Sequence, residues 1–192
     1  MRRFVVASAS PRRRELLSSA GYTFEVIPSD ADETLPDGIS ARGAVVELAK
    51  RKAHSVLKNE TDAVVLGCDT VVSLDGKILG KPKTHEEAEE MLRALSGRAH
   101  EVFTGVCIAD GEKEECFVSC TNVEFYSLSD ETVRSYVQTE EPMDKAGAYG
   151  IQGLGSVLVK KLDGDYFTVM GLPVNKCARV LALFGIEGKV IL

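Results

Sequence analysis

Hydrophobic and polar positions along the chain alternate between helix-like and strand-like patterns. Apolar residues three or four apart, preceded by a capping residue, predict helices, whereas strict alternation or a short continuous apolar run predicts strands. The expected helices cover residues 11–20, 41–57, 84–95, 130–138 and 173–184. The expected strands cover residues 4–7, 22–27, 63–67, 71–74, 77–79, 99–109, 115–126, 156–162, 165–169 and 189–192.

This order of elements predicts an α/β protein. Helices alternate with strands, and short turns at Asp75-Gly76 and Asp110-Gly111-Glu112 join two antiparallel pairs, so we expect a mixed, strongly twisted sheet flanked by helices. No linker, repeat or low-complexity segment divides the chain. Residues 1–192 are therefore expected to form a single domain, with two lobes around a central cleft.

Composition narrows the class of protein. The 29 acidic and 23 basic side chains give a net charge of -6, which disfavours stable binding to nucleic acid. No apolar run is long enough to cross a bilayer, so we expect no membrane partner and a cytoplasmic location. The five cysteines are scattered without a C-x-x-C pair, which favours buried reduced thiols.

Serines and arginines gather where the first strand ends and the first helix begins. Ser10 suits the helix cap and Pro11 the first helical position, while Arg12 and Arg13 fall in the first turn. Cations are unfavourable at a helix N-terminus, where free amides and the positive end of the dipole attract anions. A solvated basic face is the simpler interpretation of these residues. Because cations are unfavourable at a helix N-terminus, however, their position favours a phosphate site that includes Ser8, Arg12 and Arg13.

Two carboxylates are candidates for a metal site. Asp69 follows a buried apolar strand, where an unpaired charge is costly, and Glu33 lies in the polar loop 28–38. Brought together, they suit Mg²⁺, which prefers one or two carboxylates plus phosphate oxygens and water. Lys52 and Lys81 would add positive charge around a polyphosphate, although most lysines are simply solvated.

Several common nucleotide and acyl-transfer motifs are missing. Residues 76–81 lack the spacing of a P-loop, and Pro82 stands where its hydroxyl ligand belongs. Residues 150–155 carry the glycines of a dinucleotide fingerprint in reversed order. Without a G-x-S-x-G elbow or a histidine partner for Cys68, a kinase, a Rossmann dehydrogenase and an acyl-transfer enzyme are all disfavoured.

Over almost its whole length the sequence resembles the Maf (septum formation inhibitor) family of nucleoside triphosphate pyrophosphatases, an ITPase-like fold. The resemblance is carried by Ser8-Ala9-Ser10-Pro11-Arg12-Arg13, Gly67-Cys68-Asp69-Thr70-Val71-Val72, Gly80-Lys81-Pro82 and Gly171-Leu172-Pro173. Residues 145–153, Lys-Ala-Gly-Ala-Tyr-Gly-Ile-Gln-Gly, are similar to the branch that acts on dTTP and UTP.

The resemblance implies hydrolysis of a nucleoside triphosphate to the monophosphate and pyrophosphate, with a divalent cation, Mg²⁺ or Mn²⁺, and a homodimer. It implies that Asp69 is the proton acceptor and that Arg12, Thr70 and Gln152 govern base choice. A carboxylate bound directly to a metal is a poor base, so Asp69 either accepts the proton or orients a metal-bound water.

Two other functions stay open at this point. The chain is expected either to hydrolyse canonical dTTP and UTP, or to remove modified pyrimidine nucleotides by the same chemistry. A third hypothesis, from a different class, is a nucleotide-sensing regulator of cell division whose hydrolysis is slow or incidental. Loss of turnover without loss of the cellular role in Asp69→Asn would favour the regulator.

Overall fold

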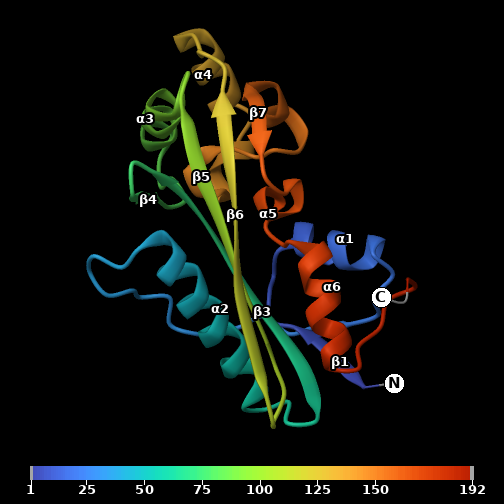
Figure 1. Cartoon of the computed structure of the whole chain (residues 1–192). Coiled ribbons are helices and arrows are strands. Elements are labelled where there is room, and N and C mark those ends of the chain that lie inside the picture. The colour runs from blue at the N-terminus through green and yellow to red at the C-terminus, as the bar shows by residue number, and fades with distance from the viewer. Residues whose placement is uncertain (1, 191–192) are drawn as a thin grey trace.

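Long apolar segments form the centre of a mixed sheet in the computed structural model, which describes residues 2–190. β1 runs parallel to β2 and β3, and every other pair of neighbours in this sheet is antiparallel. The predicted class, a mixed sheet flanked by helices, is confirmed (Figure 1). The strand order is β2 (Glu25–Val26), β1 (Arg3–Val6), β3 (Ala63–Leu74), β5 (Ala99–Ala109), β6 (Glu114–Phe125) and β7 (Val159–Asp163), and β4 (Lys77–Leu79) pairs with the far end of β3.

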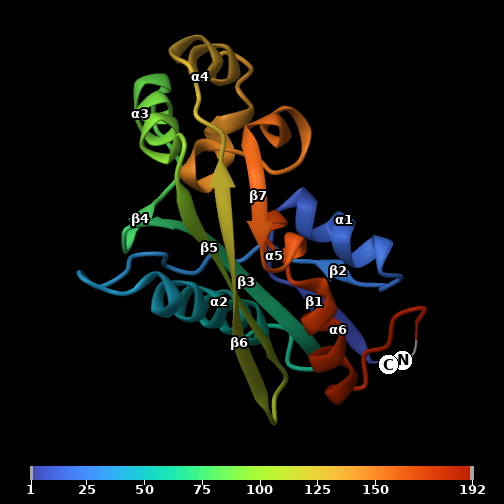
Figure 2. The ribbon, with the colours of Figure 1, turned by 45° about the horizontal axis from the view of Figure 1, so that its top comes forward.

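Helices cover both faces of the sheet (Figures 1 and 2). α2 lies along one face, and α1, α5 and α6 lie on the other, while α3 and α4 cover the opposite end of the long strands. Their bounds are α1 Pro11–Ser19, α2 Ala41–Leu57, α3 His85–Leu95, α4 Asp130–Val137, α5 Tyr166–Met170 and α6 Val174–Leu183, with short 3-10 helices at Glu141–Asp144, Ala146–Ala148 and Gly153–Leu158.

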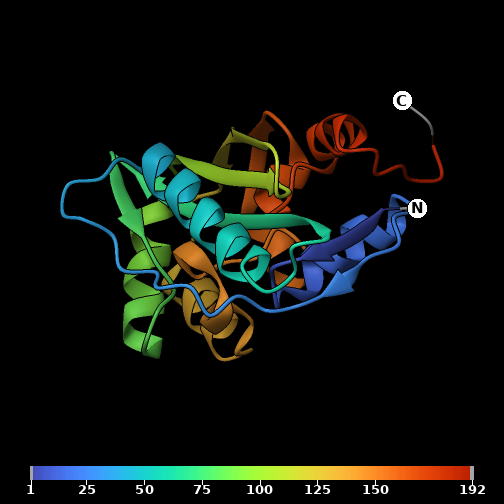
Figure 3. The same ribbon diagram turned by 90° about the horizontal axis from the view of Figure 1, so that it is seen from below.

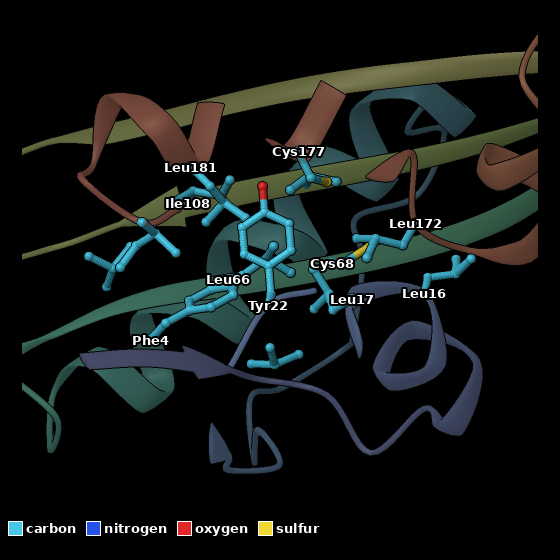
Figure 4. Close-up of a cluster of buried hydrophobic side chains, with 14 of the residues drawn as sticks. Phe4, Leu16, Leu17, Tyr22, Leu66, Cys68, Ile108, Leu172, Cys177 and Leu181 are labelled. Atoms are coloured by element: carbon cyan, nitrogen blue, oxygen red, sulfur yellow. The ribbon is translucent and has the colours of Figure 1, made fainter. Parts of the chain in front are cut away.

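The alternation of β3 divides the core between the two faces of the sheet. Val64, Leu66 and Cys68 face α1 and α6, whereas Ala63 and Val65 pack against α2. Figure 4 shows the first of these clusters, in which the rings of Phe4 and Tyr22 meet edge to face with their centroids 6.2 Å apart. Both faces of β3 are thus buried, which explains its nearly continuous apolar sequence.

A separate cluster builds the second lobe. Leu92 and Leu95 of α3, Val133 of α4 and Phe125 of β6 pack together at the far end of the sheet. Thr84 caps α3 by accepting a hydrogen bond from the backbone N–H of Glu87, as its capping box predicts. β3, β5 and β6 run through both lobes (Figure 1).

The structure corrects several predicted strands. Residues 63–67 and 71–74 belong to one strand, because β5 pairs with β3 without interruption from Val65 to Ser73. Residues 165–169 fall largely in a helix instead, because the Asp165 side chain caps the backbone N–H of Thr168.

Smaller differences concern strand ends. The strand expected at 22–27 is reduced to β2, Glu25–Val26, because only these residues pair with β1. The one expected at 156–162 begins as a 3-10 helix, so β7 starts at Val159. Residues 189–190 form a bend and not a strand, and 191–192 lie outside the described residues.

Candidate active site

A gap in the edge of β3 creates a cleft in the molecule. β1 pairs with Ala63–Leu66 and β4 pairs with Val72–Leu74, so in the described residues no strand covers positions 67–71 on that side. One cleft, with a volume of about 680 Å³, therefore reaches both faces of β3. Every side chain that the sequence singled out lines it: Ser8, Arg12, Arg13, Glu33, Lys52, Asp69, Thr70, Lys81 and Gln152.

α2 lies along one face of the sheet (Figure 3), and two glycines let it approach closely beside this gap. A Cβ atom on Gly67 would lie 2.2 Å from the carbonyl oxygen of Ala49 in α2. A Cβ atom on Gly105, which pairs with Asp69 across the sheet, would lie 2.3 Å from the carbonyl oxygen of Val45. Any larger side chain at these two positions would push α2 away from the sheet. The glycines therefore set the distance between Lys52 and Asp69.

Lys52 joins the two predicted metal-site carboxylates. Its Nζ lies 2.6 Å from Oδ1 of Asp69 and 2.9 Å from Oε1 of Glu33. Burial alone would lower the pKa of Lys52, but the two carboxylates more than offset this effect and the pKa is raised. The lysine is therefore charged at neutral pH, and the loop 28–38 is held against α2 and β3 by an ion pair.

Arg13 reaches the cleft from the first turn of α1. Its guanidinium donates hydrogen bonds to the carbonyl of Gly171 (2.8 Å), to Oγ of Ser8 (3.0 Å) and to Oγ1 of Thr70 (3.3 Å). All three partners are neutral, and within residues 2–190 no carboxylate lies within 4.0 Å of it. Its positive charge is thus fixed in place but not neutralised, as an anion site requires.

Thr70 is held from behind by a chain of hydroxyl groups. Its Oγ1 lies 2.9 Å from that of Thr104 on β5, which donates to the carbonyl oxygen of Thr168 in α5. Thr104 is fully buried, so this contact links β3, β5 and α5 beneath the cleft. Ser10, by contrast, occupies the N-cap of α1 without the side-chain cap bond that the sequence suggested.

Gln152 lies on a segment whose backbone is held by hydrogen bonds to Glu141 and Tyr136. Glu141 accepts hydrogen bonds from the backbone N–H groups of Leu154 and Gly155, and from the hydroxyl of Tyr136. That hydroxyl in turn accepts from the backbone N–H of Gly150. The glutamine side chain is half-buried and lines the cleft from a rigid backbone.

Comparison with known proteins identifies the family of the chain. Residues 3–184 match the family model described as Maf-like protein. The chain belongs to the Maf-like family. It is 47% identical over 187 residues to proteins named dTTP/UTP pyrophosphatase from Bacillus cereus (strain AH820) and Bacillus anthracis (strain CDC 684 / NRRL 3495), covering 97% of this chain and 98% of each of theirs. The solved structure of the Staphylococcus aureus Ham1 protein has a TM-score of 0.48 at 17% identity, over 82% of this chain and 79% of that one.

In this Maf-like protein the structure corrects the position of Asp69. The residue lies in the middle of β3, and not at a strand terminus, yet it still faces the cleft because its neighbour β1 has already ended. The carboxylate reaches solvent past the open edge, and its pairing with Lys52 satisfies the charge.

Sequence reasoning missed the supporting residues of the cleft. Asp144 forms ion pairs with the predicted Arg12 (3.6 Å) and with Lys145 (2.6 Å), and so holds one further cation, Lys145, at the rim. Tyr136 and Glu141 are the anchors of the Gln152 segment. The one available signal was the polar content of residues 139–155, which predicts an ordered loop but not its partners.

Cys68 is excluded as a nucleophile. Its thiol is fully buried on the α6 side of β3 and donates a hydrogen bond to the carbonyl of Gly171. Burial raises the pKa of Cys68 to about 11, so the reactive thiolate is scarce at neutral pH. The cleft therefore depends on oxygen and nitrogen groups for its chemistry.

Proposed function

We propose that this Maf-like protein hydrolyses nucleoside triphosphates, preferably dTTP and UTP, to the nucleoside monophosphate and pyrophosphate. The single observation that carries the proposal is the convergence of Asp69 and Glu33 on Lys52, beside Arg13, in one cleft. The names of the Bacillus relatives support the choice of substrate.

Positive side chains would hold the triphosphate. Arg13 has a fixed guanidinium without a carboxylate partner in the described part of the chain, and the exposed Lys81 follows β4 at the rim. Arg12 and Lys52 add charge from α1 and α2, and Ser8 offers a hydroxyl beside Arg13. The leaving pyrophosphate gains negative charge in the transition state, which such pre-positioned cations stabilise.

Glu33 and Asp69 would hold the divalent cation. Both place a carboxylate oxygen within 3 Å of the same Lys52 nitrogen, and hard oxygen ligands of this kind suit Mg²⁺ or Mn²⁺. Such a cation, when bound, screens phosphate charge and lowers the pKa of a bound water. Lys52 occupies the place between the carboxylates and would shift toward the phosphates when substrate binds.

Asp69 would act on the attacking water. The water oxygen forms a bond to the α-phosphorus, its proton passes to a base, and the bond from the α-phosphorus to the bridging oxygen breaks to release pyrophosphate. Asp69 accepts this proton or orients the water, and before substrate binds its carboxylate is held 2.6 Å from Nζ of Lys52.

Base choice would fall to Arg12, Thr70 and Gln152. A glutamine amide presents a donor and an acceptor side by side, as does the edge of uracil or thymine with its N–H and carbonyl groups. The rigid backbone below Gln152 limits how far this side chain can adapt to other bases. The same edge is shared by modified pyrimidines, which remain alternative substrates.

Product analysis with matched variants tests the proposal. Wild-type protein with Mg²⁺ is expected to release monophosphate and pyrophosphate from dTTP and UTP, but little from dATP, GTP or 7-methyl-GTP. Asp69→Asn is expected to lose at least ~100-fold in kcat, whereas Asp163→Asn, an exposed carboxylate on β7, keeps wild-type turnover. Equal turnover by both variants would refute the role of Asp69. Binding of nucleotide without turnover, with Mn²⁺ also tried, would favour the sensing regulator.

Other expectations remain predictions. We propose that the chain is a single Maf-like domain over residues 1–192, supported by the match over 3–184 and by the strands shared between lobes. A homodimer and a cytoplasmic location are also predicted from the family resemblance and the sequence. Among the described residues, no helix combines the length and the apolar character that a membrane crossing needs.

A further inference from the structure

A second group of potential ligands lies away from the cleft, where the end of α2 meets the β5–β6 hairpin (Figure 1). It consists of His54 on α2, Cys107 on β5 and Glu114 at the start of β6. The imidazole nitrogen, the thiol sulfur and a carboxylate oxygen lie within 4.8 Å of one another. Within residues 2–190 no other set of three such side chains is so close, and none of these three lines the cleft.

The carboxylate in this group is already oriented. One oxygen of Glu114 lies 2.7 Å from Nζ of Lys50, one helical turn before His54 on α2. The other oxygen is paired with Nε2 of His54. Lys50 can therefore keep its contact while the second oxygen and the imidazole turn to a common ligand, as outer partners do in metal sites.

A second thiol stands beside the first. Cys116 is the partner of Cys107 in the β5–β6 register, so the two side chains project from the same face of the sheet. Cys107 is buried and Cys116 is half-buried. The apolar side chains of Ala53 and Val56 pack around Cys107, so a cation here would be shielded from water on one side.

We propose that His54, Cys107 and Glu114 form a binding site for a thiophilic divalent cation of the Zn²⁺ type, and that the neighbouring Cys116 turns toward the cation as the fourth donor. Sulfur, imidazole and carboxylate together match the ligands of tetrahedral zinc, and differ from the oxygen ligands that Mg²⁺ prefers. Each thiol that binds releases its proton to solvent as the sulfur–metal bond forms, so the cation replaces the protons of the buried thiols.

Such a site would tie together three elements. α2 contributes His54, and β5 and β6 contribute the sulfur and carboxylate ligands from two sides of a turn. A cation bound only in the folded state raises stability through mass action. The melting temperature of the wild-type protein should therefore rise with added Zn²⁺ after removal of metal by a chelator.

Co²⁺ is a direct probe of the sulfur ligands, because a thiolate–cobalt bond gives a near-ultraviolet charge-transfer band. Metal-free, reduced wild-type protein is expected to develop this band with one equivalent of Co²⁺ and to lose it when Zn²⁺ displaces the cobalt. His54→Ala removes an exposed ligand without disturbing the core, and should weaken Zn²⁺ affinity about tenfold or more. Cys107→Ser should weaken the band, and Cys107→Ser combined with Cys116→Ser should abolish it.

Three control variants test whether the cation binds at these four residues. His85→Ala removes an exposed histidine on α3, and Cys120→Ser removes a thiol farther along β6, so both should retain the band and the affinity. Asp69→Asn changes the cleft and should also retain them, which keeps the result independent of the proposed hydrolysis. The proposal is overturned if reduced wild-type protein gives no band, or if His54→Ala binds Zn²⁺ as tightly as wild type.

Discussion

His100 is the most unusual single residue beneath the cleft. It is 3% exposed, its Nε2 lies 2.8 Å from the hydroxyl of Tyr149, and its ring meets those of Phe125 and Tyr149 edge to face. Among the described residues its Nδ1 has no hydrogen-bond partner. Burial lowers the pKa of His100 to about 4, so the imidazole is neutral in the folded protein.

This neutral histidine predicts a loss of stability in mild acid. Between its unfolded pKa of 6.5 and its folded pKa of about 4, only the unfolded chain takes up the proton, so the free energy of unfolding falls as pH falls. The full loss is roughly 3 kcal/mol, and about half or more of it appears by pH 5. Urea unfolding at pH 7 and pH 5 measures it. His100→Gln should flatten the dependence while His85→Gln should not; an unchanged slope in His100→Gln would contradict the assignment.

Gln152 is expected to affect selectivity more than rate. A single hydrogen bond contributes about 0.5–1.5 kcal/mol, so Gln152→Ala should lower kcat/KM for dTTP relative to dATP by roughly two- to tenfold. The control Leu154→Ala, an exposed neighbour on the same segment, should leave the ratio unchanged. Competition assays with both nucleotides give the ratio directly. A uniform loss for every nucleotide would instead assign Gln152 to general binding.

At the scale of elements, the contact between α2 and the sheet matters most. Gly67→Ala would place a methyl group 2.2 Å from the Ala49 carbonyl oxygen and force α2 outward. We expect a destabilisation of about 1–3 kcal/mol, with a lower kcat because Lys52 moves away from Asp69. Gly111→Ala, whose added methyl would have its nearest neighbour 3.9 Å away, should stay within about 0.5 kcal/mol. Urea unfolding and dTTP turnover test both variants. If Gly67→Ala and Gly111→Ala have the same stability and the same kcat, α2 tolerates displacement and the prediction is wrong.

Most elements could be predicted because their signals are local. The cap of α3 at Thr84 and the alternation of β5 and β6 depend on neighbouring residues alone. The prediction failed where distant contacts decide, as in β3, which β5 holds continuous past Asp69. It also failed at residues 165–169, where a strand-like alternation competes with the Asp165 cap.

The residues that line the cleft could be predicted from the sequence, but their pairing within it could not. All nine predicted residues line one cleft; seven of them were selected by their charge or hydroxyl group and position, whereas Thr70 and Gln152 came from the family resemblance. Their pairing depends on how α2 lies on the sheet, which is set by two glycines that carry no chemical signal. The support of Gln152 by Tyr136 and Glu141 depends likewise on contacts between separate segments.

For the whole molecule, the net charge of -6 opposes an anionic substrate, so attraction must come from the local cluster of Arg12, Arg13, Lys52 and Lys81. The screening length falls from about 10 Å at 0.1 M salt to about 3 Å at 1 M. We therefore expect KM for dTTP to rise severalfold over this range while kcat changes less. Lys81→Gln should raise KM at low salt and reduce its salt dependence, as steady-state kinetics at several NaCl concentrations will show. A salt-independent KM would contradict local attraction.

The strands shared by the two lobes limit how the protein can move. Enzymes with separate domains often close on substrate by rotation about a flexible connection, and here β3, β5 and β6 pass unbroken from one lobe to the other. Rotation of the lobes would have to bend a continuous hydrogen-bonded ribbon. Access to the reacting phosphate is therefore expected to be gated by the acidic loop 28–38, which is attached through the Glu33–Lys52 ion pair, and release of that loop, not hinge opening, would set the rate at which product leaves.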